Sequence, residues 1–311
     1  MNHFRTIGAC VAVAVSTAAL VAEPAVSILP SAEYAIIDKR LVSGEWQIEI
    51  TARDTGAPLA ASDVTITIQA NNNEPIGLVI IGNNTGTSFG YPARQAKLTI
   101  NKPTTGTSPA NIGFVAMHPS TPNRDIVLKL LDVRGTLGKA GTTPAVSCPN
   151  IEQVRVLGNV VNDIVASQGA GSTSSISTID VTNGYIGGSI YAPYGSIGPV
   201  SSAQTIAARS TTFPFEPNGA VNIYARDTIQ SVTSTTGMIW ANIDANAYNT
   251  TGRLGSVAGS SFKGSIRATG FYGANGGDFN RISIDNDLQG DITLTGAALG
   301  YQQDTGLPQK Q

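Results

Sequence analysis

Three aspartates near the C-terminus have the residue type and spacing that come nearest to a metal site. Asp285 and Asp287 occupy the first and third positions of a calcium-loop pattern. Gln289 and Gly296 stand at the fifth and twelfth positions, where that pattern needs stronger oxygen ligands, so the full motif is broken. A tight turn could still bring Asp285, Asp287 and Asp291 around Ca²⁺. The alternative interpretation is that these acids alternate with apolar residues along a strand.

Large aromatic residues recur directly after isoleucines in the second half of the chain. Tyr191, Tyr224 and Trp240 each follow an Ile, and Arg267 does the same. If these segments stack in register, the four side chains line one outer face. Aromatic rings with polar groups at regular spacing are suited to bind sugar rings or a protein surface. These four residues are therefore the candidate binding site.

Groups for acid–base or nucleophilic catalysis are sparse. His118 precedes a proline in a loop-like stretch, and Cys148 has no neighbouring His or basic residue. They are interpreted as a loop histidine and a packed thiol. Phosphate-loop, dinucleotide, CxxC and HExxH motifs are missing from the sequence. Acids and bases that an enzyme might use are present without a spacing that aligns them: Arg226, Asp227, Asp244, Arg253, Arg267 and Arg281.

A repeat must position these residues. From about residue 125 onward a short unit, apolar-x-x-Val/Ile, recurs with start-to-start steps of 25, 21, 32, 25 and 25 residues. Its copies are Ile151/Val154, Ile176/Ile179, Ile197/Val200, Ile229/Val232, Leu254/Val257 and Phe279/Ile282. A second, less regular unit carries Val160, Ile190, Ile223, Ile239, Ile266 and Ile292. One such unit cannot bury its apolar face alone, so the period predicts a parallel β-solenoid with like residues stacked on like. A β-sandwich is the alternative.

The 32-residue step predicts an inserted loop, Ser201–Gly219. This loop contains Phe213 and Phe215, which need apolar surroundings. It could fold over the aromatic column and bury it, because exposed apolar patches are uncommon on monomers.

The repeats resemble coils of right-handed parallel β-helix proteins of the pectin-lyase-like and adhesin type. The segments Ile176–Val181 and Gly188–Ala192 carry the resemblance, which spans roughly residues 125–296 and concerns the fold alone. No family motif is matched, so the resemblance transfers no functional residue. The parallel β-helix is expected over residues 125–300, followed by a polar tail over 301–311.

Residues 33–122 have a different texture. Alternating segments such as 46–52 and 64–68 are separated by turn clusters, which predicts strands half buried against a core. The sequence therefore predicts an all-β protein, with a small antiparallel β domain ahead of the β-helix.

The first 30 residues are expected to be a signal peptide with an uncertain cleavage site. His3 and Arg5 precede an uncharged run over residues 6–22, which is shorter than a membrane span needs. Only Cys148 then remains, so no internal disulfide forms, which fits an exported bacterial protein. A formal net charge of -2 argues against a nucleic-acid binder.

These features favour an exported, non-enzymatic surface, matrix or adhesion scaffold that binds polysaccharide or a surface protein. The alternative is a carbohydrate-active β-helix enzyme, a lyase or hydrolase, which needs paired acids or an acid and a base in a groove. A further expectation is end-to-end self-association, because uncovered end coils favour edge pairing. No cofactor is expected apart from the Ca²⁺ considered above.

Overall fold

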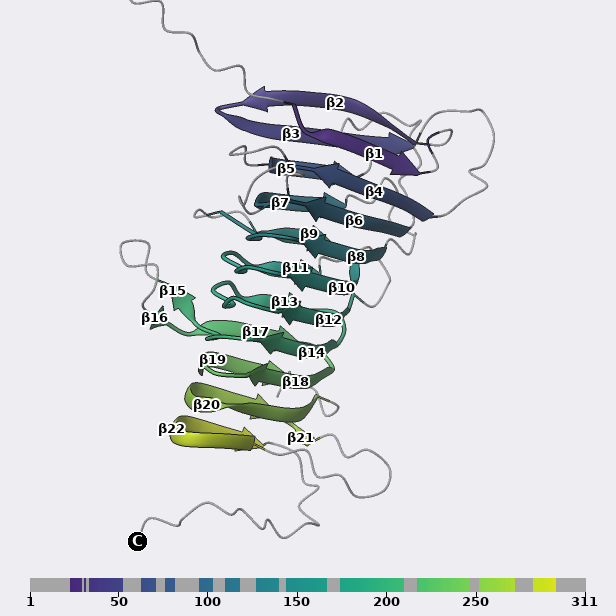
Figure 1. The fold of residues 1–311 in the computed structure, drawn as a ribbon. Helices are drawn as coiled ribbons and strands as arrows, with labels where there is room; N and C mark the ends of the chain where they lie inside the picture. Colours follow the sequence, from purple (N-terminus) through teal and green to yellow (C-terminus); the bar gives the residue numbers. More distant parts are fainter. Residues whose placement is uncertain are drawn as a thin grey trace, which may run out of the picture.

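A computed structural model describes thirteen stretches of the chain. They are residues 23–29, 31, 34–52, 63–70, 76–81, 95–102, 110–117, 127–139, 144–166, 174–209, 217–245, 252–271 and 282–294. All regular elements in these stretches are β-strands. The strands form one tall pile of coils, with β1, β2 and β3 at one end and β22 at the other (Figure 1). The all-β prediction is thus confirmed.

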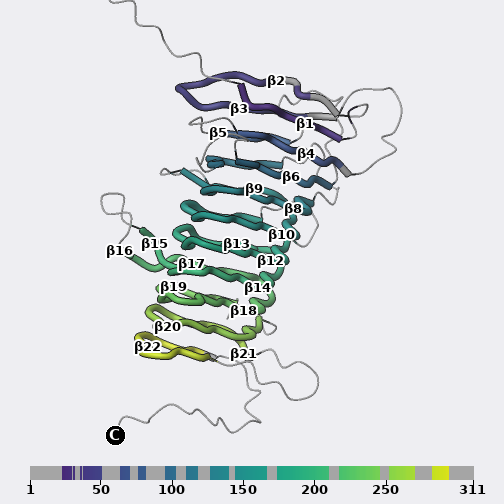
Figure 2. The backbone as a smooth tube through the Cα atoms, in the orientation of Figure 1, coloured from purple at the N-terminus to yellow at the C-terminus, as the bar shows by residue number. Residues whose placement is uncertain are grey.

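Two stacks of strands face each other along the pile, and from β3 to β14 successive strands of the chain alternate between them (Figure 2). The first stack consists of β1 (Ala25–Leu29), β4 (Asp63–Gln69), β6 (Gln95–Asn101), β8 (Val127–Val133), β10 (Asn150–Val156), β12 (Ile176–Val181), β14 (Ile197–Ser202), β18 (Thr228–Ser234), β21 (Gly270–Phe271) and the leading parts of β20 (Arg253–Ala268) and β22 (Ile282–Leu294). The second stack consists of β2 (Tyr34–Val42), β3 (Glu45–Ala52), β5 (Ile76–Ile81), β7 (Ile112–Met117), β9 (Val146–Cys148), β11 (Ile164–Ala166), β13 (Ile190–Ala192), β17 (Val221–Ala225), β19 (Met238–Ala245) and the trailing parts of β20 and β22. A separate pair, β15 (Ala208–Arg209) and β16 (Pro217–Gly219), forms a small hairpin beside them.

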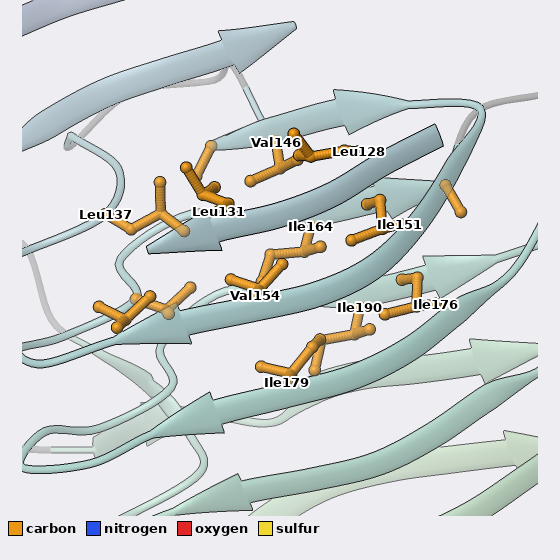
Figure 3. Packing of buried hydrophobic residues seen from close by; sticks show 14 of the residues in the cluster. Leu128, Leu131, Leu137, Val146, Ile151, Val154, Ile164, Ile176, Ile179 and Ile190 are labelled. Carbon is orange, nitrogen blue, oxygen red and sulfur yellow. The ribbon is translucent and has the colours of Figure 1, made fainter. Parts of the chain in front are cut away.

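The register of the first repeat unit is as predicted. Ile151 pairs with Ile176, Ile176 with Ile197, Ile197 with Ile229, and Ile229 with Leu254. The second apolar residue of each copy, three positions after the first, pairs in the same order from Val154 to Ile282. Phe279, the first residue of the last copy, lies outside the described residues. These side chains point into the space between the two stacks (Figure 3) and are fully buried from Ile151 to Val257. Burying such a column supplies the hydrophobic free energy that one coil alone lacks.

A third inward column lies where the coil passes from the first stack to the second. It is made of isolated parallel bridges that join Leu137, Val160, Ile186, Ile206 and Ile239 in succession. All five side chains are fully buried. Each coil therefore contributes apolar side chains from three places, which closes the core on this side.

Polar side chains at the corners bond from one coil to the next. Asn150 Oδ1 accepts a hydrogen bond from the Ser175 backbone N–H at 3.0 Å, and Asp163 Oδ1 accepts from the Ser189 N–H at 2.7 Å. Likewise, Asn159 Oδ1 accepts a hydrogen bond at 3.1 Å from the backbone N–H of Tyr185, which lies in the next coil. Corner backbone groups have no regular strand partner, so these side chains satisfy them.

The structure does not confirm a separate antiparallel domain over residues 33–122. β3 pairs with β5, β5 with β7, β4 with β6, and β6 with β8, all in parallel. The solenoid thus begins at β3 and β4, and the pairings β6–β8 and β7–β9 cross the expected boundary near residue 122. Antiparallel pairing in the described main sheet is limited to β1–β4 and β2–β3. Alternation of apolar and polar residues is the same for both pairing directions, so sequence alone did not separate them.

The strand β1 lies inside the range 1–30 that was assigned to the signal peptide. Ile28 pairs with Ile66 and is 8% exposed, so it belongs to the core. Lys39 makes an ion pair with Glu23 and donates to the Pro24 carbonyl. A signal peptide whose removal leaves these contacts intact has to end before Glu23.

Candidate functional site

The candidate site lies on the outer side of the second stack, from β13 to β20. We call this surface the polar face. It is defined by the outward side chains Ser189, Tyr191, Asn222, Tyr224, Trp240, Asn242, Asp244, Lys263, Ser265 and Arg267. Each alternates along its strand with a buried residue of the core, as Tyr191 does with Ile190 and Ala192. The core therefore fixes the direction in which the whole face points.

The two tyrosines of the predicted site are neighbours. Tyr191 pairs with Tyr224 across β13 and β17, and both rings are half-buried. Adjacent strands lie about 4.8 Å apart, so the two side chains form one aromatic surface rather than two separate ones.

Trp240 lies in a different column from the tyrosines. Tyr224 pairs with Asp244, not with Trp240, and Trp240 pairs with Lys263. The cause is that β19 contains two inward isoleucines, and Ile243 rather than Ile239 continues the column of Ile223. Asp244 follows Trp240 by four positions, which is about 13 Å along a strand. Val160 was assigned to the same wrong column, and it belongs to the bridge column at the corner.

The Trp240 ring is held by a cation. Lys263 Nζ lies 4.0 Å from the centre of the indole, which is a cation–π contact. Trp240 itself is half-buried, whereas Lys263 is exposed. The contact orients the ring and places a positive charge over one of its faces.

Arg267 shares the tyrosine column but sits beyond Asp244. It pairs with Asp244 in the register, and its Nη1 lies 3.9 Å from Asp244 Oδ2. At this distance an exposed ion pair contributes about 0–1 kcal/mol. Arg267 thus places its guanidinium next to the tyrosine column, within reach of Asp244.

A ladder of polar side chains runs between the tyrosines and Trp240. Asn242 Nδ2 donates to Asn222 Oδ1 at 3.2 Å, and Ser265 Oγ donates to Asn242 Oδ1 at 3.0 Å. At its upper end Asn222 Nδ2 lies 3.4 Å from the Tyr191 hydroxyl. The sequence analysis missed this ladder, although Asn222 and Asn242 each precede an isoleucine of the same inward column.

The hairpin of β15 and β16 flanks this surface. Arg209 stacks over the Tyr185 ring at 4.3 Å, and burial lowers the pKa of its guanidinium. The tip of the insertion, with Phe213 and Phe215, lies outside the described residues. Burial of the aromatic column by this loop therefore stays a prediction.

The predicted calcium site is not formed. Asp285, Asp287 and Asp291 are all exposed on β22, whose pairing with β20 shifts in register between Ile284 and Asp287. Asp291 follows Asp287 by four positions, which is about 13 Å along a strand. Two carboxylates at that separation are too far apart to bind one ion. Within the described stretches no three His, Cys, Asp or Glu side chains gather as a metal would need.

The remaining reactive groups do not build a catalytic centre in the described part of the chain. Cys148 is fully buried, and burial raises the pKa of its thiol to about 12. Arg226 is engaged by its neighbour Asp227 at 3.0 Å, and this hydrogen bond raises the pKa of the guanidinium. His118 and Arg281 lie outside the described residues, and Arg253 is exposed at the start of β20.

Comparison of the chain with protein-family models, curated proteins and solved structures gives no match. The described stretches also contain no helix with the length and apolarity of a bilayer span.

Proposed function

We propose that the protein is an exported, non-enzymatic surface or matrix scaffold that binds a polysaccharide through its polar face. One observation carries the proposal. The polar ladder of Asn222, Asn242 and Ser265 is flanked by aromatic rings on both sides, with Tyr191 and Tyr224 on one side and Trp240 on the other.

This arrangement matches the chemistry of a sugar chain. Pyranose rings stack their C–H faces on aromatic rings, and their hydroxyls exchange hydrogen bonds with amides and hydroxyls. The distance of about 13 Å between the Trp240 column and the tyrosine column leaves room for the polar ladder in between. Asn242 can then serve both as donor and as acceptor to a sugar between the rings.

The setting also favours binding over hydrolysis. A hollow on the N-terminal part of the second stack, lined by Asp38, Arg40 and Glu49 among others, is about 20 Å³ in volume. That is room for about one water molecule. On the polar face Asp244 is engaged with Arg267, and no second acid stands beside it among the described residues.

The test is a glycan array and polysaccharide pull-down that compares the protein with the Tyr191→Ala/Tyr224→Ala/Trp240→Ala variant. We expect binding by the unaltered protein and at least tenfold weaker binding by the variant, since each stacked ring contributes about 0.5–1.5 kcal/mol. The control is Tyr194→Ala, because Tyr194 is an aromatic residue that is 36% exposed and lies at a corner off the polar face.

Two results contradict the proposal. Equal binding by the protein and the triple variant, or binding by neither, removes the polar face as the site. Release of unsaturated or reducing sugar ends during the same incubation would replace the scaffold by the enzyme.

A further inference from the structure

Three groups of the polar face lie on one straight line. In the register of β17 and β19, Asn222 pairs with Asn242 and Tyr224 pairs with Asp244. Tyr224 follows Asn222 by two positions, and Trp240 precedes Asn242 by two positions. Successive outward residues of a strand are about 6.6 Å apart, and neighbouring strands are about 4.8 Å apart. On this grid the midpoint between Tyr224 and Trp240 coincides with the midpoint between the two asparagines.

The line is longer than one sugar ring. Four positions along a strand and one step between strands place the Cα atoms of Tyr224 and Trp240 about 14 Å apart. A pyranose ring is similar in size to the ring of a tyrosine, so one sugar cannot stack on both aromatic side chains. A linear chain can do so if one unit stacks on Tyr224, another stacks on Trp240, and at least one more unit lies over the asparagines between them.

The asparagine pair is held in place and keeps bonding capacity for a ligand. Asn242 Nδ2 donates to Asn222 Oδ1 at 3.2 Å, and Ser265 Oγ donates to Asn242 Oδ1 at 3.0 Å. Asn222 Nδ2 donates to the Tyr191 hydroxyl at 3.4 Å. A carboxamide has two N–H donors and two oxygen lone pairs, so each of these amides keeps one donor and one lone pair. A sugar hydroxyl, which both donates and accepts, can use both kinds of group.

The middle of the line carries no charge. Asn222 and Asn242 are both exposed, and the charged side chains stand toward the two ends of the line. At one end Asp244 Oδ2 lies 3.9 Å from the Arg267 guanidinium, and at the other end Lys263 lies over the Trp240 ring. The centre thus offers neutral donors and acceptors in equal number. Such a set favours the hydroxyls of a neutral sugar over a carboxylate or a sulfate, which only accept hydrogen bonds.

We propose that the polar face binds an internal segment of a linear, neutral polysaccharide, which lies across β17 and β19 from Tyr224 to Trp240. The inference rests on the proposed function and specifies the ligand of the same site. A terminal sugar would contact one ring and leave the other bare. A chain that ran along the solenoid axis from Tyr224 would next meet Asp244 and Arg267, which form an ion pair and offer no ring to stack on.

The test is the dependence of affinity on chain length. Isothermal titration calorimetry is carried out with sized oligosaccharides of cellulose, of xylan and of linear mannan, from the single sugar to the hexasaccharide. For the series that binds, we expect the affinity to rise about fivefold from the disaccharide to the tetrasaccharide, because only the longer chain reaches both rings. Beyond the tetrasaccharide the affinity should change by less than about twofold, because both rings are then occupied.

Variants assign the gain with length to the two ends of the line. Trp240→Ala and Tyr224→Ala should each abolish the gain between the disaccharide and the tetrasaccharide, since either variant leaves a single ring on the line. Asn222→Ala/Asn242→Ala should lower the affinity at every length and retain the gain. Tyr194→Ala removes an aromatic side chain at a corner away from the line and is the control, with both affinity and gain unchanged. Urea denaturation of each variant shows whether it is folded.

The failure of this inference can be told apart from the failure of the proposed function. Affinity that does not rise with length, a gain that survives in Trp240→Ala, or binding on the glycan array to terminal, branched or anionic sugars alone would overturn the inference. In each of these cases the protein still binds a glycan, and the proposed function stands. If neither the array nor the oligosaccharides show binding, both are overturned.

Discussion

The N-terminal and C-terminal coils share one fold but differ on both sides of the second stack. On the inner side, Ile50 and Ile81 stand where the later coils have Ala192, Ala225, Ala245 and Ala268. On the outer side, Ile80 and Ala116 are buried at 8% and 0%, where the later coils present the half-exposed Tyr191 and Tyr224. At this position the outer face is thus buried in the early coils and partly exposed in the later ones.

The change from isoleucine to alanine also shows how the coil adjusts its width. Met117 is the last large side chain at this position before the small Cys148 follows in β9, and a large residue returns only at Leu294 in β22. From Ala166 onward the position holds alanine as far as Ala268. Smaller side chains require the two stacks to lie closer there, because protein interiors are packed without large voids.

Removing bulk from an early coil should have the largest effect. Ile81→Ala deletes a fully buried side chain, and we expect it to lower the free energy of unfolding by about 2–5 kcal/mol. Urea denaturation followed by circular dichroism measures the loss. A loss below about 1 kcal/mol would show that the early coils collapse onto the cavity as freely as the later ones. Leu29→Ala, at an exposed position of β1, is the matched control.

Adding bulk to a later coil should have the next largest effect. Ala245→Met recreates the early-coil side chain where Ala245 is fully buried, and overpacking costs about 1–3 kcal/mol. The same denaturation experiment applies, with Gln230→Met at an exposed position of β18 as the control. If Ala245→Met is neutral, the spacing of the stacks does not follow the size of this side chain.

The buried thiol of Cys148, where the column changes from large to small side chains, predicts that the free energy of unfolding depends on pH. Because burial raises the pKa of Cys148 from 9.0 to about 12, the unfolded chain loses the thiol proton at a lower pH than the folded chain. The contribution to stability is therefore complete below pH 9 and is lost as the pH rises from about 9 toward 12. Urea midpoints at pH 8 and pH 10.5 should differ more for the protein than for Cys148→Ala. Equal differences would contradict the buried state of the thiol.

The polar ladder should contribute least to stability. Asn242→Ala removes two hydrogen bonds on an exposed surface, and we expect a loss of about 0.5–1 kcal/mol. Sugar binding should fall in the same variant by several fold if the proposed function holds. Ser256→Ala, on the outer side of the first stack, tests whether any outward polar residue has this effect. A larger stability loss than for Ala245→Met would assign the ladder to the framework instead of the binding surface.

The sequence predicted the solenoid where its period was regular and failed where loop lengths vary. Between Ile151 and Leu254 the first repeat unit predicted the register correctly, because buried β-branched side chains must stack on one another. In the early coils Ile48, Val79, Val115 and Val146 belong to one column, yet they are separated by 31, 36 and 31 residues. Such uneven steps hide the period, so the alternation there suggested an antiparallel domain.

Much of the site could not be predicted for a related reason. In β19 both Ile239 and Ile243 point inward, and the sequence offers no way to decide which of them continues the column of Ile223. Choosing Ile239 placed Trp240 beside the tyrosines and hid the role of Asn242. The side-chain pairs themselves, such as Lys263 on Trp240, depend on that choice of register.

The corner hydrogen bonds join each coil to the next one, so that the solenoid lengthens or shortens by whole coils. Since Asn150 binds the backbone at Ser175 and Ser175 Oγ binds the backbone at Ser196, every coil is tied to its immediate neighbours. Excising residues 176–196 would remove one whole turn of the chain and let the next turn occupy its place. The length of the solenoid therefore changes by about 4.8 Å with each turn gained or lost.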